Sequence, residues 1–216
     1  MAELLIPFAA DSSEKLAVAD EFGSTDWKNF NERVNQLIHA LRGQGLKTGD
    51  AFSVMSGNRR EYVEAFAAAA HGGWLLVPIN WHLVASEISY ILENSASKAF
   101  LIDSRFYELG MQTISLENAP NISPIVVMGE PERDTSTQHR NIFTYEEFLS
   151  KEKSHEPENQ SLGGPMFYTS GTTGHPKGVK SALSQTGTPV GTLKMIGDGL
   201  SGMLSIEPGG KTLLVA

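Results

Sequence analysis

The chain has 216 residues, of which 40% are hydrophobic and 19% charged, a composition typical of a folded globular protein. Its 17 basic and 25 acidic residues give a net charge of −8, which argues against a general nucleic-acid binder because phosphate contacts need clustered Lys and Arg. There is no cysteine, so disulfides and thiolate chemistry are excluded. No secretory signal and no membrane-spanning apolar run are visible, which predicts a soluble cytoplasmic protein.

Helical periodicity predicts three helices in the first half of the chain. The first starts near Asp26, and its apolar residues are Phe30, Val34, Leu37, Ile38 and Leu41. The second is expected to start at an N-cap Asn58, with Glu61 completing a capping box. Its apolar side is formed by Tyr62, Val63, Phe66 and Ala70.

The third helix, Glu87 to Asn94, presents Ile88, Ile91 and Leu92. The expected cap position, three residues before Glu87, holds Val84, which has no side-chain acceptor and cannot cap, so the start either lacks a cap or shifts to Ser86.

Short apolar runs between these helices predict buried strands. They span Asp50–Ser56, Trp74–Ile79, Lys98–Asp103 and Pro124–Gly129. The alternation of strands and helices predicts an α/β fold with parallel βαβ units and flanking helices. Trp74 and Trp81 flank one strand and are expected in the core.

The remaining chain is less regular. An exposed loop is predicted for Glu130–Arg140, and a short helix for Thr144–Ser150, in which Glu146 and Glu147 lie on a solvated face. The stretch 151–161 has almost no apolar residue and reads as a solvated connector. Two strands follow, Gly164–Tyr168 and Lys177–Leu183, joined by 169–176. A hairpin turn needs only about two to five residues, so the longer joint indicates a loop that holds a ligand.

The composition of this loop fits a phosphate cradle. Its glycines allow close backbone approach, its hydroxyls donate hydrogen bonds and its lysine supplies positive charge. These candidate residues are Thr169, Ser170, Gly171, Thr172, Thr173, Gly174 and Lys177. Pro176 before the lysine excludes a Walker A loop, and Ser170 lacks the Gly-x-Ser-x-Gly elbow of a hydrolase nucleophile. The alternative is a flexible, solvent-exposed turn.

The segment "YTSGTTGHPKGV" closely resembles the phosphate-binding signature of the adenylate-forming enzymes, which include acyl-CoA synthetases, luciferases and peptide-synthetase adenylation domains. The stretches "WKNFNERVNQLIHALRGQGLKTGD", "NRREYVEAFAAAAHGGWLLVPIN" and "SEISYILENSASKAFLID" resemble the amino-terminal subdomain of these enzymes, in the same order. The similarity covers most of residues 20–216 and is weakest over 106–161. "PINWHL" and the loop are most similar to bacterial fatty acyl-CoA synthetases.

The resemblance implies an ATP-dependent ligase. A carboxylate, here a fatty acid, attacks the α-phosphate of Mg²⁺-bound ATP to give an acyl-adenylate, and the thiol of coenzyme A then displaces AMP. The loop residues would hold the β- and γ-phosphates, with Lys177 as the charge partner. Two alternatives stay open: a non-catalytic nucleotide- or phosphate-binding module, and an acyl-AMP ligase that loads a carrier protein.

The resemblance also implies a domain organisation. Residues 1–216 correspond to the amino-terminal portion of a large adenylation domain, with a first α/β subdomain (1–150), the connector (151–161) and the loop hairpin with a following helix and strand (162–216). The family's carboxylate and adenine pockets and its small carboxy-terminal lid domain lie downstream. We therefore expect a fragment that is inactive alone and able to self-associate through surface exposed by truncation. No catalytic residue is placed, and the six histidines show no metal-ligand spacing.

Overall fold

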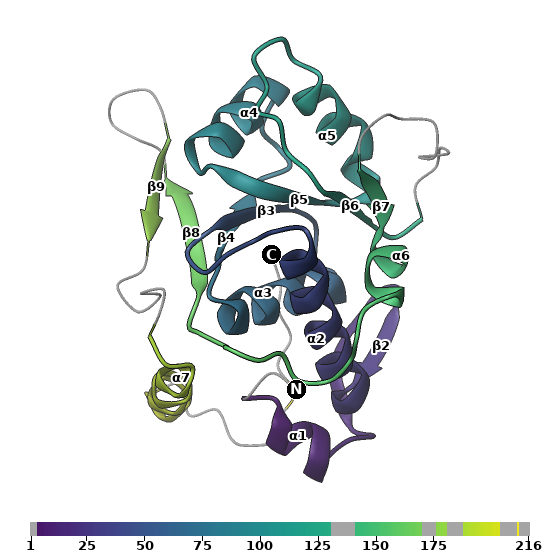
Figure 1. The fold of residues 1–216 in the computed structure, drawn as a ribbon, viewed down its shortest axis with the longest axis vertical. Helices are drawn as coiled ribbons and strands as arrows, with labels where there is room; N and C mark the ends of the chain where they lie inside the picture. The colour runs from purple at the N-terminus through teal and green to yellow at the C-terminus, as the bar shows by residue number, and fades with distance from the viewer. Residues whose placement is uncertain (1–3, 131–140, 170–175, 181–187, 204–210, 212–216) are drawn as a thin grey trace.

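The computed structural model describes residues 4–130, 141–169, 176–180, 188–203 and 211 (Figure 1). Its main feature is a seven-stranded sheet in the order β7-β6-β5-β3-β4-β8-β9. The strands are β3 (Ala51–Met55), β4 (Leu75–Ile79), β5 (Ser97–Asp103), β6 (Ile125–Met128), β7 (Ile142–Thr144), β8 (Gly164–Thr169) and β9 (Lys177–Lys180). All neighbouring pairs are parallel except β8 and β9, which are antiparallel. The predicted α/β fold with parallel βαβ units is confirmed.

Helices cover both faces of this sheet (Figure 1). The helices on one face are α2 (Trp27–Gly43), α3 (Arg60–Gly72) and α6 (Tyr145–Ser150). Those on the other face are α4 (Ala85–Asn94) and α5 (Tyr107–Ile114). Strand β3 serves both cores, since Phe52 packs into the first and Met55 into the second. Burial on both faces explains why the central strands are continuous apolar runs in the sequence.

Four further elements and one turn of 3₁₀ helix complete the described chain. They are α1 (Ile6–Asp11), the hairpin strands β1 (Leu16–Asp20) and β2 (Gly23–Asp26), the 3₁₀ turn Ser104–Phe106 and α7 (Gly191–Met203). In the described part of the chain, no helix is long and apolar enough to cross a bilayer.

The first predicted helix is confirmed in its start and in its buried face. Asp26 caps α2, because its carboxylate accepts a hydrogen bond from the Asn29 backbone N–H at 2.7 Å. All five predicted apolar side chains of this helix are buried. Gly45 follows the helix with φ of +91°, a conformation that glycine adopts without steric cost.

The predicted start of α3 is wrong. The N-cap is Arg59 rather than Asn58, and its side chain makes no capping bond. The Asp20 carboxylate instead accepts a hydrogen bond from the Arg60 backbone N–H at 2.8 Å. Glu61 does not complete a capping box, because its carboxylate accepts hydrogen bonds from Arg59 Nε and Nη2 at 3.1 and 2.9 Å. An ion pair between two buried side chains gives Glu61 a stronger partner than a backbone N–H.

The predicted apolar side of α3 is also only partly right. Ala70 is buried, Tyr62 and Val63 are half-buried, and Phe66 is 39% exposed. The helix instead buries a row of small side chains, Ala65, Ala68 and Ala69. Alanines allow α3 to approach its neighbours closely. The prediction was based on the larger apolar side chains and therefore placed the buried face wrongly.

The helix Glu87–Asn94 is confirmed, with Ile88, Ile91 and Leu92 buried. It starts at Ala85, so the start does not shift to Ser86. Val84 occupies the N-cap without a side-chain bond to the helix, while the Glu87 carboxylate accepts from the Val84 backbone N–H at 3.1 Å.

The connector 151–161 is mostly exposed, as predicted, but it is also bound to α2. Side chains of α2 bind several of its backbone carbonyl groups. Among them, Asn35 donates to Ser154 at 2.9 Å, Gln36 to Glu152 at 3.2 Å and Arg42 to Glu158 at 2.6 Å. The predicted loop Glu130–Arg140 lies outside the described residues except for Glu130. The predicted final strand near the end of the chain lies outside them as well.

Candidate phosphate-binding hairpin

The two described residues of the predicted phosphate loop lie opposite each other. Strand β8 ends at Thr169, β9 begins at Lys177, and these residues are cross-strand partners. Both side chains are exposed. The other five predicted residues, Ser170, Gly171, Thr172, Thr173 and Gly174, lie outside the described residues.

The position of this hairpin suits ligand binding. Strand β8 runs parallel to β4, so Thr169 follows the carboxyl end of a strand in a parallel sheet. Ligands of open α/β sheets bind outside the carboxyl ends of the strands. The salt bridges among the described residues do not include Lys177. An exposed hydroxyl and an ammonium group in one cross-strand pair provide a donor and a positive charge for an anion.

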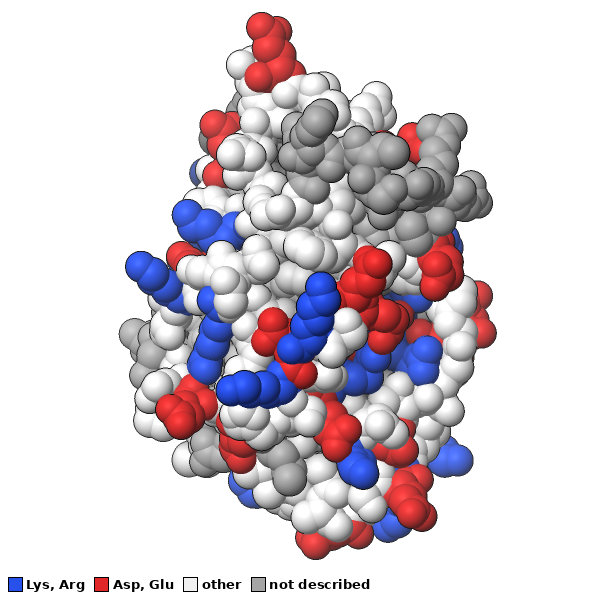
Figure 2. Space-filling view, turned by 45° about the vertical axis from the view of Figure 1, so that its right-hand side comes forward, with Lys and Arg blue, Asp and Glu red and all other residues white. Residues whose placement is uncertain are grey.

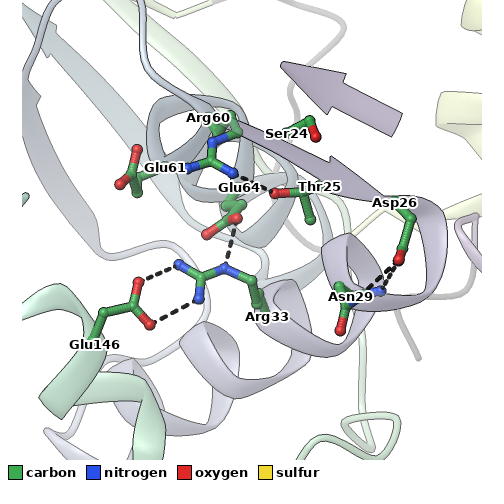
Figure 3. Close-up of a pocket in the computed structure, with 9 residues that line it drawn as sticks. All are labelled: Ser24, Thr25, Asp26, Asn29, Arg33, Arg60, Glu61, Glu64 and Glu146. Carbon is green, nitrogen blue, oxygen red and sulfur yellow. Dashed lines mark hydrogen bonds and ion pairs between the residues drawn. The ribbon is translucent and has the colours of Figure 1, made fainter. Parts of the chain in front are cut away.

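A cavity of about 300 Å³ lies elsewhere, among β2, α2, α3 and α6 (Figure 3). Its lining is almost entirely polar: Ser24, Thr25, Asp26, Asn29, Arg33, Arg60, Glu61, Glu64 and Glu146. None of these residues belongs to β8 or β9. On the face shown in Figure 2, basic and acidic side chains are interspersed, and the same mixture of charges lines this cavity.

Arg33 joins two carboxylates at the cavity wall (Figure 3). Its Nε donates to Glu64 at 2.8 Å, and its two terminal nitrogens donate to Glu146 at 2.9 and 2.8 Å. Burial raises the pKa of Glu64 above its usual value, although Arg33 and the Tyr145 hydroxyl both favour the charged form. The hydrogen bonds from Arg33 lower the pKa of the exposed Glu146. These pairings give the cavity a structural role.

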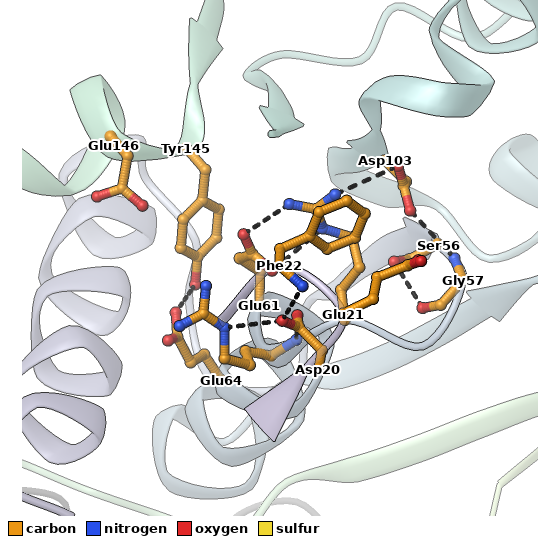
Figure 4. Close-up of polar contacts among 12 residues, drawn as sticks. Asp20, Glu21, Phe22, Ser56, Gly57, Glu61, Glu64, Asp103, Tyr145 and Glu146 are labelled. Carbon is orange, nitrogen blue, oxygen red and sulfur yellow. Dashed lines mark hydrogen bonds and ion pairs between the residues drawn. The ribbon is translucent and has the colours of Figure 1, made fainter. Parts of the chain in front are cut away.

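A second polar cluster lies at the carboxyl ends of β3 and β5 (Figure 4). The fully buried Asp103 carboxylate accepts a hydrogen bond from Arg105 Nη2 at 2.7 Å. Its other oxygen lies 3.7 Å from Arg59 Nη1. Burial acts to raise the pKa of Asp103, but the hydrogen bonds from Arg105 outweigh it and lower that pKa. Phe22 covers the cluster, with the Arg59 guanidinium 4.2 Å from its ring centre. No group of three or more His, Asp or Glu residues in the described ranges is arranged to hold a metal.

The two predicted core tryptophans differ. Trp74 is fully buried and contacts Phe52 edge-on at 6.1 Å between ring centres. Trp81 is 40% exposed, so its prediction as a core residue is wrong. It follows β4 in a loop, where its ring stacks on Phe106 at 4.9 Å with an interplanar angle of 9°. The Trp81 ring therefore packs on Phe106 rather than in the core.

The sequence and the fold both match known proteins. The family model described as "AMP-binding enzyme" matches residues 7–195, which is most of the chain. The chain belongs to the AMP-binding enzyme family.

Curated relatives of this AMP-binding chain are ligases that act on carboxylic acids. It is 32% identical over 168 residues to 3-oxocholest-4-en-26-oate–CoA ligase of Rhodococcus rhodochrous, covering 77% of this chain and 30% of that protein. It is 30% identical over 167 residues to the fatty acid–[acyl-carrier-protein] ligase ScoC of Streptomyces coeruleorubidus, covering 76% and 29% respectively. The chain therefore spans about 30% of the length of these relatives.

Solved structures show the same fold. The anthranilate CoA ligase AuaEII, in complex with anthranoyl-AMP, matches with a TM-score of 0.71 at 23% identity, over 82% of this chain and 33% of that one. A Mycobacterium tuberculosis fatty acyl CoA synthetase matches with a TM-score of 0.65 at 25% identity, over 82% and 33%.

The sequence predicted the loop of this AMP-binding chain but not the side chains that bond to residues at its two ends. Tyr168, directly before Thr169, donates from its hydroxyl to Asn94 Oδ1 at 2.7 Å. Tyr90 donates to the carbonyl oxygen of Pro176, directly before Lys177, at 3.2 Å. Tyr90 and Asn94 are four residues apart and so lie on one face of α4. That spacing was readable, but nothing in the sequence indicated what the face would contact.

Proposed function

We propose that the protein containing this chain is an ATP-dependent ligase that activates a carboxylic acid, a fatty acid, and joins it to a thiol. The observation that carries the proposal is the exposed Thr169–Lys177 pair at the ends of the loop, in a chain of the AMP-binding family. Because the chain spans about 30% of its first relatives, the proposed activity belongs to the whole protein.

The chemistry requires activation because a free carboxylate is a poor electrophile. Attack of the carboxylate oxygen on the α-phosphate of ATP breaks the bond to the β-phosphate, forms an acyl-adenylate and releases pyrophosphate, and AMP is then a good leaving group. The proposed role of the loop is to bind the β- and γ-phosphates and to neutralise the charge that develops on pyrophosphate. Lys177 supplies the positive charge, and Thr169, Ser170, Thr172 and Thr173 supply hydroxyl donors. Gly171 and Gly174 allow backbone N–H groups to approach the phosphates.

The metal and the domain organisation belong to the same proposal. Mg²⁺ would be held through the phosphates of ATP and would offset their charge. The division into 1–150, 151–161 and 162–216 remains a proposal, in which the last part presents the loop to ATP.

Substrate and acceptor follow from the relatives. Several act on fatty acids by name, including the medium-chain-fatty-acid–CoA ligase of Ectopseudomonas oleovorans, at 26% identity over 156 residues that cover 71% of this chain and 28% of that protein. Coenzyme A is therefore the proposed acceptor. ScoC, which is named for an acyl-carrier protein, supports the second candidate, an acyl-AMP ligase that loads a carrier protein.

The test is carboxylate-dependent exchange of labelled pyrophosphate into ATP, measured on the full-length protein with fatty acids of increasing chain length. Exchange that requires a fatty acid supports acyl-adenylate formation. Adding coenzyme A or an acyl-carrier protein in a second assay then identifies the acceptor from the thioester formed. ATP binding without exchange for any acid would favour a non-catalytic binding module and contradict the proposal.

A further inference from the structure

We propose that Tyr90 and Asn94 of α4 are positioning residues that fix the two ends of the phosphate loop, and so set the affinity of the protein for the triphosphate of ATP. This inference rests on the proposed function. Its structural part, the attachment of the hairpin to α4, can be tested without any activity. We call the two side chains the α4 anchor.

The α4 anchor holds one residue at each end of the loop. The Asn94 side-chain oxygen accepts from the Tyr168 hydroxyl at 2.7 Å, at the amino-terminal end. The Tyr90 hydroxyl donates to the Pro176 carbonyl at 3.2 Å, at the carboxy-terminal end. That carbonyl belongs to the peptide group that leads into Lys177. A fixed peptide plane at this point fixes the direction in which the Lys177 side chain leaves the backbone.

The Tyr168 side chain reaches α4 by crossing the hairpin. Tyr168 and Gly178 are cross-strand partners. A methyl group added at Gly178 would lie 3.1 Å from Cζ of Tyr168 and 3.3 Å from its hydroxyl oxygen, so the ring covers the glycine. Glycine at this position therefore leaves room for the ring to lie over β9. Partial burial and the nearby Tyr90 raise the pKa of Tyr168, so its hydroxyl keeps the proton that it donates to Asn94.

The helix that carries the anchor is firmly packed. Ile88, Ile91 and Leu92 are at most 2% exposed and belong to the core on that face of the sheet. The hairpin, by contrast, joins the rest of the sheet by a short ladder, in which Gly164 and Pro165 of β8 pair with Leu75 and Leu76 of β4. A well-packed helix can hold loop residues in the geometry that a bound ligand requires. Without the anchor, ATP would have to order the loop ends as it binds, and this cost would weaken its binding.

Single-hydroxyl and single-amide variants test the inference on the full-length protein. We expect Tyr90→Phe and Asn94→Ala each to raise KM for ATP about two- to tenfold, the range that corresponds to one net hydrogen bond. KM for the carboxylate should stay unchanged, because the anchor acts on the triphosphate side alone. A residue with a merely structural role would lower activity through stability and would not separate the two KM values.

Tyr107→Phe is the matched control. It removes a buried tyrosine hydroxyl from the neighbouring helix α5, and this hydroxyl has no hydrogen-bond partner among the described residues. We expect unchanged KM values. In the Tyr168→Phe background, Asn94→Ala should have no further effect, because the two changes remove the same bond.

Amide hydrogen exchange of peptides covering 166–180 supplies the readout that is independent of activity. Faster exchange there in Tyr90→Phe and Asn94→Ala, but not in Tyr107→Phe, supports the anchor. Unchanged exchange in both variants would overturn it. If the wild-type protein shows fatty-acid-dependent pyrophosphate exchange while both variants keep the wild-type KM for ATP, the inference fails and the proposed function stands. If the wild type shows no such exchange, the proposed function fails, and the predicted rise in KM for ATP fails with it.

Discussion

The central strands and the β8–β9 hairpin belong to one sheet but are held in different ways. Residues of β3 and β5 are almost all buried between two helical layers. In the hairpin, Phe167 and Val179 form a cross-strand pair whose members are 52% and 51% exposed. The core is stabilised by burial between two helical layers, whereas this face of the hairpin is open to solvent. We therefore expect Phe167 and Val179 to contribute little to stability.

The largest expected effect comes from removing a large side chain from the core. Trp74→Ala should lower the free energy of unfolding by about 3–5 kcal/mol, because it leaves a cavity beside Phe52. Phe167→Ala also removes an aromatic ring, but from the exposed hairpin face, and should cost less than about 1 kcal/mol. Urea unfolding of both variants measures the difference. Equal losses would show that the hairpin is as strongly packed as the core.

A second prediction divides one ion-pair network into a buried and an exposed half. Arg33→Met leaves the Glu64 carboxylate buried without its cation and should cost about 3 kcal/mol at pH 8. Glu146→Gln removes only the exposed carboxylate, whose side chain is 69% exposed, and should cost less than about 1 kcal/mol.

The Arg33→Met deficit should depend on pH. The pKa of Glu64 is raised in the folded protein, so its contribution to stability is fully present below the unfolded carboxyl pKa and is lost as pH rises through the folded value. Without Arg33 this pKa rises further, and the deficit should shrink as pH is lowered from 8 towards 5. Unfolding measured across this range checks the sign. A deficit independent of pH would show that Glu64 is not the group left unpaired.

Smaller changes in stability are expected at the N-caps of two helices, α6 and α4. Thr144 caps α6 in a full capping box with Glu147, so Thr144→Ala should cost about 1 kcal/mol. Val84 holds the same position at α4 with only the glutamate half of the box, so Val84→Thr should gain about 0.5–1 kcal/mol. Thermal unfolding should therefore shift in opposite directions. A loss of stability in Val84→Thr would mean that the exposed valine makes a contact that threonine cannot replace.

The sequence predicted the parts of the fold that depend on local pattern. The buried face of α2, the apolar strands and the parallel βαβ order all follow from periodicity, and each is confirmed. The errors come from side-chain contacts that periodicity does not indicate. Glu61 was predicted to cap a helix, but its carboxylate is paired with Arg59. Trp81 was predicted to lie in the core, but it lies in a loop, where its ring stacks on Phe106.

The candidate site shows the same division. The loop was predicted because its glycines, hydroxyls and lysine are specific in composition and order. The α4 anchor was not found, because one of its bonds ends on the Pro176 backbone carbonyl, a group that every residue has. The connector was misjudged in part for the same reason, since α2 side chains bind its backbone carbonyls. A sequence pattern does not show which carbonyl a distant side chain will reach.

The most direct test of the central claim compares two lysines of the same strand. Lys177 and Lys180 both lie in β9 and both are exposed, but only Lys177 belongs to the proposed phosphate loop. We expect Lys177→Ala to lower the kcat/KM for ATP in fatty-acid-dependent pyrophosphate exchange by about tenfold or more, and Lys180→Ala to change it less than about twofold. Equal effects of the two substitutions, or an unchanged kcat/KM in Lys177→Ala, would contradict the assignment of this hairpin as the triphosphate site.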